Sequence, residues 1–104
     1  MIKEITVKFN EIEYRVKRSN RALMFFEDLT KKSIEEISGT LTDILTVFYC
    51  CLVVNNTEFN ISFDDFIEQS DNNKQAFEDF KTYLIDLSLE ISSEESDKKK
   101  ELEN

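Results

Sequence analysis

The chain has 104 residues, enough for one compact domain, and its 22 acidic against 13 basic side chains give a formal net charge of −9. It has no histidine and a single glycine, which excludes histidine-based acid–base catalysis, histidine metal ligands and a glycine-rich phosphate loop. The negative charge argues against direct binding of nucleic acid, which depends on excess Lys and Arg, so the composition is typical of a small acidic binding module.

Two short runs near the N-terminus, residues 5–9 and 12–16, alternate apolar and polar side chains with the period of a β-strand. A two-residue turn at Asn10 and Glu11 places all their apolar side chains on one face of a hairpin. The register that this turn fixes pairs the following residues: Glu4 with Lys17, Ile5 with Val16, Val7 with Tyr14, Lys8 with Glu13, and Phe9 with Ile12. Both charged pairs are favourable, and the sequence therefore predicts an N-terminal β-hairpin.

Apolar side chains with helical spacing follow the hairpin. Ser19 or Asn20 can cap a first helix, whose apolar stripe comprises Ala22, Phe25, Phe26 and Leu29. A capping-box sequence that begins at Ser33 predicts a short helical turn running towards Gly39. We expect Gly39 to end that turn in a left-handed conformation, which glycine adopts without steric cost.

The most apolar part of the chain, residues 41–54, is predicted to be a central buried helix that Thr40 caps and Asn55 ends. It is shorter than the roughly 20 apolar residues that span a bilayer. Its adjacent cysteines, Cys50 and Cys51, point about 100° apart on a helix, which is a poor geometry for a disulfide. We therefore expect two buried free thiols in a reducing compartment.

Two further helices are predicted, one from Phe63 to about Gln69 after a Ser62 cap, and a longer one after Asp71 or Asn72. The longer helix carries an apolar stripe of Phe77, Phe80, Leu84, Leu87 and Ile91. The sequence thus predicts one α+β domain over residues 1–91, an N-terminal β-hairpin followed by a bundle of about four to five helices. The acidic and lysine-rich segment 92–104 is expected to be a disordered tail.

No constellation of side chains predicts catalysis. Asp64 and Asp65 lie in the first turn of a predicted helix, where the helix dipole favours acids for structural reasons. The stretch that begins at Asp71 starts like a calcium loop but lacks its glycine and its glutamate. The sequence therefore predicts no enzyme, no catalytic residue, no metal and no cofactor.

Phe59, Phe63 and Phe66 cluster around the predicted short helix. They either complete the core or form an exposed apolar patch, and in the second case they are the candidate partner-binding residues. Charge is also uneven, with a net +3 in residues 1–32 and −12 in residues 33–104. This polarity either steers a partner or orders homo-oligomers, or it is ordinary solvated surface.

Three stretches of the chain, taken in this order after the hairpin, carry a family resemblance. They are RALMFFEDLTKKS at Arg21–Ser33, LTDILTVFYCCLVV at Leu41–Val54 and SFDDFIE at Ser62–Glu68. Together they resemble the small tail assembly chaperones of long-tailed phages and prophages, over residues 2 to about 91. That family favours glycine after the first helix, where this chain has Lys31.

The resemblance implies a non-enzymatic chaperone that binds and solubilises the tape measure protein and helps recruit tail tube subunits. The expected partners are the tape measure and tail tube proteins of the same phage, with no nucleic acid and no membrane. The expected location is the host cytoplasm, since residues 1–10 lack the apolar block of a signal peptide, and such chaperones leave before the virion matures.

Many members of that family are also made in a longer frameshifted form. The run Lys98–Lys100 is compatible with an adenine-rich slippage site, although a solubilising lysine run in a tail is its plain interpretation. Two other functions stay open from the sequence. One is an acidic inhibitor that mimics nucleic acid, and the other is a small structural tail or connector subunit.

Overall fold

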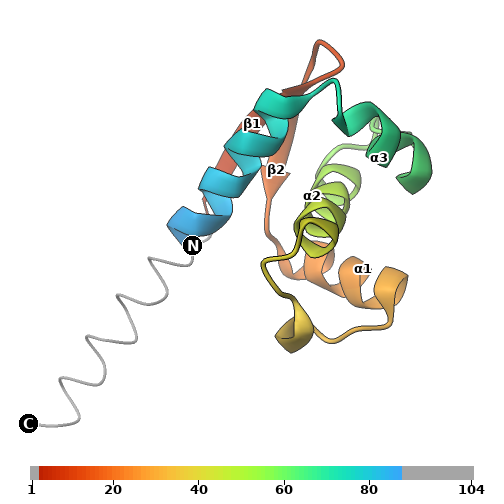
Figure 1. Ribbon diagram of the computed structural model, residues 1–104, viewed down its shortest axis with the longest axis vertical. Coiled ribbons are helices and arrows are strands. Elements are labelled where there is room, and N and C mark those ends of the chain that lie inside the picture. The colour runs from red at the N-terminus through yellow and green to blue at the C-terminus, as the bar shows by residue number, and fades with distance from the viewer. Residues whose placement is uncertain (1–2, 88–104) are drawn as a thin grey trace, which may run out of the picture.

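The N-terminal hairpin forms as the alternating sequence predicts. The computed structural model describes residues 3–87, and its first two elements are the antiparallel strands β1 (Glu4–Phe9) and β2 (Ile12–Lys17) (Figure 1). The strands pair in the predicted register, from Glu4 opposite Lys17 to Phe9 opposite Ile12. The face that this register makes apolar is turned to the core, where Val7, Phe9, Tyr14 and Val16 are buried.

The turn of the hairpin uses two residues in the left-handed region. Asn10 has a φ of 52° and Glu11 a φ of 66°, the positive signs that a type I′ turn requires at both central positions. Asn tolerates this conformation, whereas Glu does so at a cost. Hydrogen bonds to two residues distant in sequence hold the turn, because the Asn10 N–H donates to Asn73 Oδ1 at 2.8 Å and the Asn10 side-chain amide donates to Gln69 Oε1.

The ion pairs on the outer face of the hairpin differ from those predicted from the register. Lys8 Nζ lies 3.6 Å from Glu11 Oε2, and Arg15 Nε lies 4.0 Å from Glu4 Oε1. The directly opposite pairs form no such contact within residues 3–87, because these long side chains reach along or diagonally across the strands instead. All four side chains are well exposed, so the change of partner has little effect on stability.

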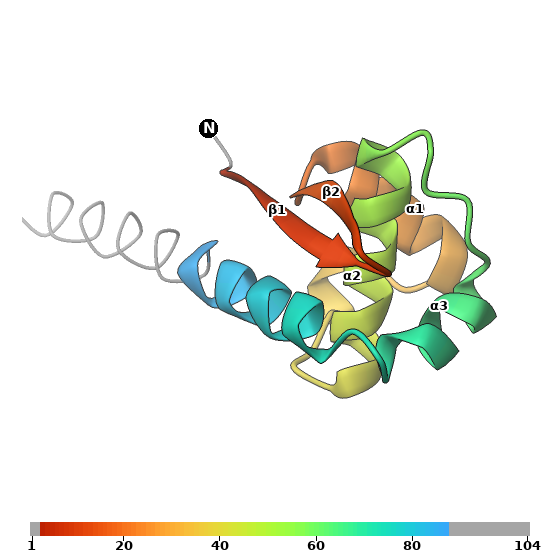
Figure 2. The same cartoon turned by 90° about the horizontal axis from the view of Figure 1, so that it is seen from above.

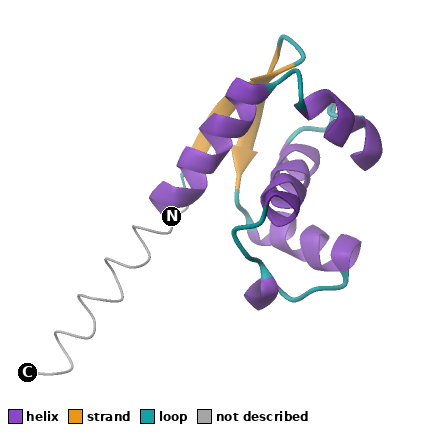
Figure 3. Ribbon diagram, viewed as in Figure 1, coloured by secondary structure: helices purple, strands orange, loops and turns teal. Residues whose placement is uncertain are grey.

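Helices make up most of the remaining described chain, as Figure 3 shows. The elements are α1 (Asn20–Thr30), the 3₁₀ turn η1 (Ile34–Glu36), α2 (Leu41–Asn55) and α3 (Phe63–Ser70), and residues 74–87 are also helical. Three predicted caps are confirmed, since Ser19, Thr40 and Ser62 each accept a hydrogen bond from a backbone N–H of the first turn. A hairpin followed by helices is the predicted α+β fold.

Helix α2 lies in the middle of the fold, surrounded by the other elements (Figure 2). It contacts β2, α1 and α3, and residues 45–52 are all buried. The largest fully buried side chains of the core are Phe9, Phe26, Phe48, Phe66, Phe80 and Leu52. Several elements supply these side chains, which explains how a two-stranded sheet too small to be stable alone holds its place.

The left-handed helix end lies at Lys31 and not at Gly39, so that prediction was wrong. Lys31 has a φ of 62°, and its N–H donates to Glu27 O at 2.8 Å. The predicted short helix is only a three-residue 3₁₀ turn that ends in extended backbone at Ile37, so Gly39 needs no positive φ. Lys31 thus occupies a conformation that favours glycine.

The last helix begins later than predicted. The turn after α3 uses Asp71 and Asn72, since the N–H of Asn72 donates to Gln69 O at 3.0 Å. Asn73 then precedes the helix of residues 74–87 and accepts from the Phe77 N–H at 3.3 Å. The predicted stripe residue Ile91, the domain boundary at 91 and the tail 92–104 lie outside the described residues.

None of the helices within residues 3–87 is both long enough and apolar enough to cross a membrane.

Candidate functional site

The three candidate phenylalanines do not form a surface patch. Phe59 and Phe66 are 4% and 0% exposed, while Phe63 is half-buried with its ring 5.2 Å from that of Tyr49. The Phe66 ring lies within 5.6 Å of the rings of three other core residues: Phe9, Phe48 and Tyr49. Phe59 and Phe66 therefore belong to the core and present no surface to a partner, which leaves Phe63 with part of its ring accessible.

The two cysteines are buried free thiols, as predicted. Burial raises the pKa of the Cys50 thiol to about 12 and raises the pKa of Cys51 as well, where the charge of Arg18 only partly opposes it. A thiol reacts as the thiolate, so neither side chain is a nucleophile near neutral pH.

Asp64 and Asp65 lie at the start of α3, where the helix dipole favours acids. Asp64 and Asp65 are exposed in its first turn, and the Asp65 N–H donates to the capping Ser62 Oγ at 3.2 Å. Within the described chain, no group of three or more His, Cys, Asp or Glu side chains is placed to hold a metal ion.

A mainly apolar hollow in the described surface is a groove of about 600 Å³ beside α2. Its lining residues are Arg18, Leu23, Ile34, Ile37, Ser38, Gly39, Ile44, Val47, Leu84 and Ile85. We call these residues the apolar groove. Ile34 and Ile85 are 45% and 58% exposed, so large apolar side chains are left in water where the groove opens. Grouped exposure of this kind marks binding surfaces, whereas single exposed apolar residues are ordinary.

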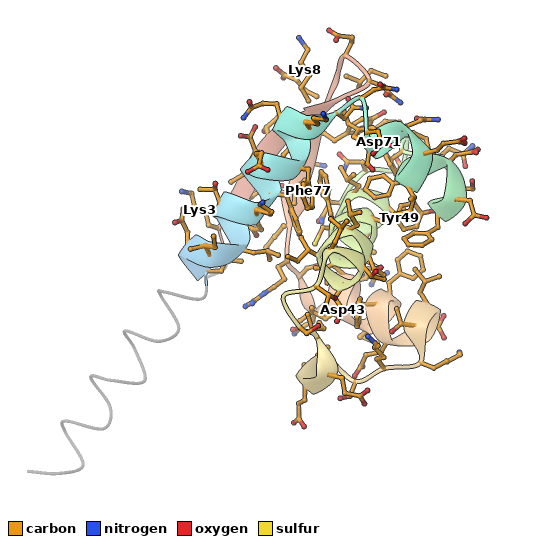
Figure 4. All side chains as sticks on the ribbon, viewed as in Figure 1. Lys3, Lys8, Asp43, Tyr49, Asp71 and Phe77 are labelled. Carbon is orange, nitrogen blue, oxygen red and sulfur yellow. The ribbon has the colours of Figure 1, made fainter. Side chains whose placement is uncertain are left out.

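One wall of the groove is held by Asp43, in the first turn of α2 (Figure 4). Its buried carboxylate accepts from the Ser38 N–H at 2.9 Å, from the Ser38 hydroxyl at 3.0 Å and from the Lys32 ammonium at 3.0 Å. The Ser38 backbone N–H and then the Lys32 side chain hold the pKa of this carboxyl below its usual value of 3.8. Asp43 therefore fixes the loop that carries Ile37, Ser38 and Gly39 into the groove.

Asp43→Asn should destabilise the protein by about 1–3 kcal/mol at pH 7, because the buried bonds lose their charge. A carboxyl whose folded-state pKa is depressed stabilises the fold above its unfolded pKa, and the stabilisation is lost as the pH falls through the folded-state pKa. Urea unfolding should therefore show the Asn variant clearly weaker than the native protein at pH 7 and nearly equal to it well below pH 3.8, the unshifted value. An equal deficit at both pH values would contradict this role.

Arg18, in the linker between β2 and α1, is the one ionic residue of the apolar groove. Its backbone N–H donates to Tyr83 Oη at 2.9 Å, and that hydroxyl donates in turn to the Lys3 carbonyl. Tyr83 thereby joins the last helix to the residue before β1 and to the residue after β2. The Arg18 Nε is buried and has no hydrogen-bond partner in the described part of the chain.

The sequence does not predict this groove. Its residues come from the β2–α1 linker, α1, η1, the following loop, α2 and the last helix, and only the folded chain brings them together. One sequence feature points to the groove. Ile85 lies outside the predicted apolar stripe of its helix, so it is an apolar residue on a face that the core does not cover.

Comparison of the chain with protein-family models, with curated proteins and with solved structures finds no match.

Proposed function

We propose that this protein is a phage tail assembly chaperone that binds and solubilises the tape measure protein and helps recruit tail tube subunits. The observation that carries the proposal is the apolar groove, a hollow lined mainly by apolar side chains from three helices and a pinned loop, with Ile34 and Ile85 exposed where it opens. Its chemistry suits the binding of an apolar surface, because the lining is apolar apart from Arg18, Ser38 and Gly39.

A helical client fits this surface. A helix with its side chains is about 10–12 Å across, and an amphipathic helix lays its apolar face into a hydrophobic groove through side chains one turn apart. Burying apolar area on both partners drives such binding and removes an aggregation-prone face of the client from water. The net charge of −9 keeps the complex soluble.

The segments that carry the family resemblance support the same proposal. The stretch Arg21–Ser33 spans most of α1 and contributes Leu23 to the groove, and Leu41–Val54 lies within α2 and contributes Ile44 and Val47. The resemblance thus covers two of the walls that a client would contact.

Co-expression with the tape measure protein of the same phage tests the proposal. The native chain should keep this client in the soluble fraction and co-purify with it. Ile85→Glu should reduce the co-purified client at least about tenfold, because a carboxylate then faces an apolar contact. Ile12→Glu is the matched control, since Ile12 is 52% exposed on the hairpin and lies outside the groove.

Two results would contradict the proposal: an Ile85→Glu variant that retains the client as well as the native chain, or a native chain that never binds it. Mass spectrometry of purified virions adds a separate measurement. A chaperone should be absent from virions, whereas a structural tail or connector subunit would remain. Salt-sensitive binding to a basic nuclease, without binding of the tape measure protein, would favour an inhibitor that mimics nucleic acid.

A further inference from the structure

The apolar groove contains one feature that simple shielding of a client does not need, the Arg18 guanidinium. We propose that Arg18 selects the client by pairing with a carboxylate, so that the groove takes a helix whose apolar face carries one Asp or Glu. This inference rests on the proposed chaperone function and specifies the chemistry of its client.

The guanidinium has no partner of its own among residues 3–87. Its Nε is buried without a hydrogen bond, and Arg18 takes part in none of the ion pairs of this part of the chain. A buried donor left without an acceptor is costly, and the cost disappears when an acceptor arrives. A carboxylate suits this donor best, because the flat guanidinium offers parallel N–H groups that bind both carboxylate oxygens.

The backbone of Arg18 is held in place, whereas its guanidinium is available to pair with a bound carboxylate. Only its backbone N–H takes part in the bond to Tyr83, so within residues 3–87 the side chain makes no hydrogen bond. Burial raises the pKa values of both Tyr83 and Cys51. The positive charge of Arg18 acts on both groups in the opposite direction, with a smaller effect. Arg18 as a whole is half-buried and its Nε is buried, so a carboxylate that pairs with it would be partly shielded from water and from salt.

Charge complementarity defines the occupant. The remaining lining residues are apolar apart from Ser38 and Gly39, so a ligand covered with charges would leave most of this surface unsatisfied. A row of apolar side chains interrupted by one acid matches the apolar walls and the single cation together.

Two synthetic 18-residue amphipathic helices test the inference, identical except for Glu or Gln at the centre of the apolar face. Fluorescence anisotropy with the full chain should show the Glu peptide binding at least about tenfold more tightly than the Gln peptide, as a charge-assisted bond predicts. Arg18→Gln should remove this preference and bring the two peptides to the same affinity. Arg18→Lys should keep only part of it, since an ammonium lacks the paired donors.

Equal affinity of the native chain for the two peptides, or a preference that survives in Arg18→Gln, would overturn the inference. Circular dichroism should show the native thermal midpoint for Arg18→Gln, which keeps a folding defect from being read as lost selectivity. If the tape measure protein co-purifies but no acidic preference is found, the Arg18 inference fails and the chaperone proposal stands. If the preference is found and the tape measure protein does not bind, the chaperone proposal fails instead.

Sedimentation tests another occupant of the groove, a second copy of this chain. Sedimentation that shows a dimer of the native chain, lost in Arg18→Gln, would assign the groove to a second copy and overturn the proposal.

Discussion

Phe66→Ala should destabilise the protein by about 3–5 kcal/mol, a large part of the roughly 5–15 kcal/mol by which small domains are stable. Phe66 is fully buried, and its ring contacts those of Phe9 from the hairpin and Phe48 and Tyr49 from α2. The truncation therefore leaves a cavity where the hairpin, α2 and α3 meet. Denaturant unfolding followed by circular dichroism measures the loss.

Phe63→Ala is the matched control, since it removes the same side chain three residues earlier in the same helix. Phe63 is half-buried, and Tyr49 supplies its one aromatic contact in the described chain. We expect a loss of about 1–2 kcal/mol, in proportion to the smaller area returned to water. Equal losses for the two variants would contradict the assignment of Phe66 to the core and Phe63 to its edge.

Asn56→Asp should also cost about 3–5 kcal/mol, by a different mechanism. Asn56 is 4% exposed and acts in place of a neighbouring strand, since its Oδ1 accepts from the Arg15 N–H at 3.0 Å and its Nδ2 donates to Arg15 O at 2.7 Å. The same Nδ2 donates to Leu52 O at 2.9 Å, which joins the end of α2 to the outer edge of β2. Aspartate would turn a carboxylate oxygen towards both carbonyls and would bury a charge.

Asn60→Asp makes the same change of charge at an exposed position in the same connection, and we expect an effect within about 0.5 kcal/mol. The two variants are compared by urea unfolding at pH 7. A midpoint for Asn56→Asp close to that of Asn60→Asp would show that the edge of β2 does not depend on the amide.

The hairpin and the helix caps were predictable because neighbouring residues determine them. An alternating pattern around a two-residue turn leaves one register that puts Val7 and Tyr14 on the same face, and a serine before an apolar run satisfies free backbone N–H groups wherever the helix later packs. The error at Gly39 has the opposite origin. The end of α1 determines which residue takes the left-handed conformation. Lys31 stands there and adopts that conformation, although it is one that glycine favours.

The candidate site was less predictable than the fold. Apolar content alone does not separate Phe66, which fills the core, from Ile85, which is exposed, since the difference arises from which faces the neighbouring elements cover. Asn56 likewise reads as a helix stop in the sequence, and its hydrogen bonds to Arg15, 41 positions away, exist only in the folded chain. Long-range contacts of this kind assemble the apolar groove.

The central claim is that the apolar groove is where this protein holds its client. Amide chemical shifts of the isotope-labelled full chain, recorded while the tape measure protein or a helical segment of it is added, test that claim most directly. We predict that the changes concentrate at Ile34, Ile37–Gly39, Ile44, Val47 and Leu84–Ile85, with the hairpin turn at Asn10 and Glu11 unaffected. Changes that gather at the hairpin turn or on α3 and leave the groove untouched would contradict it.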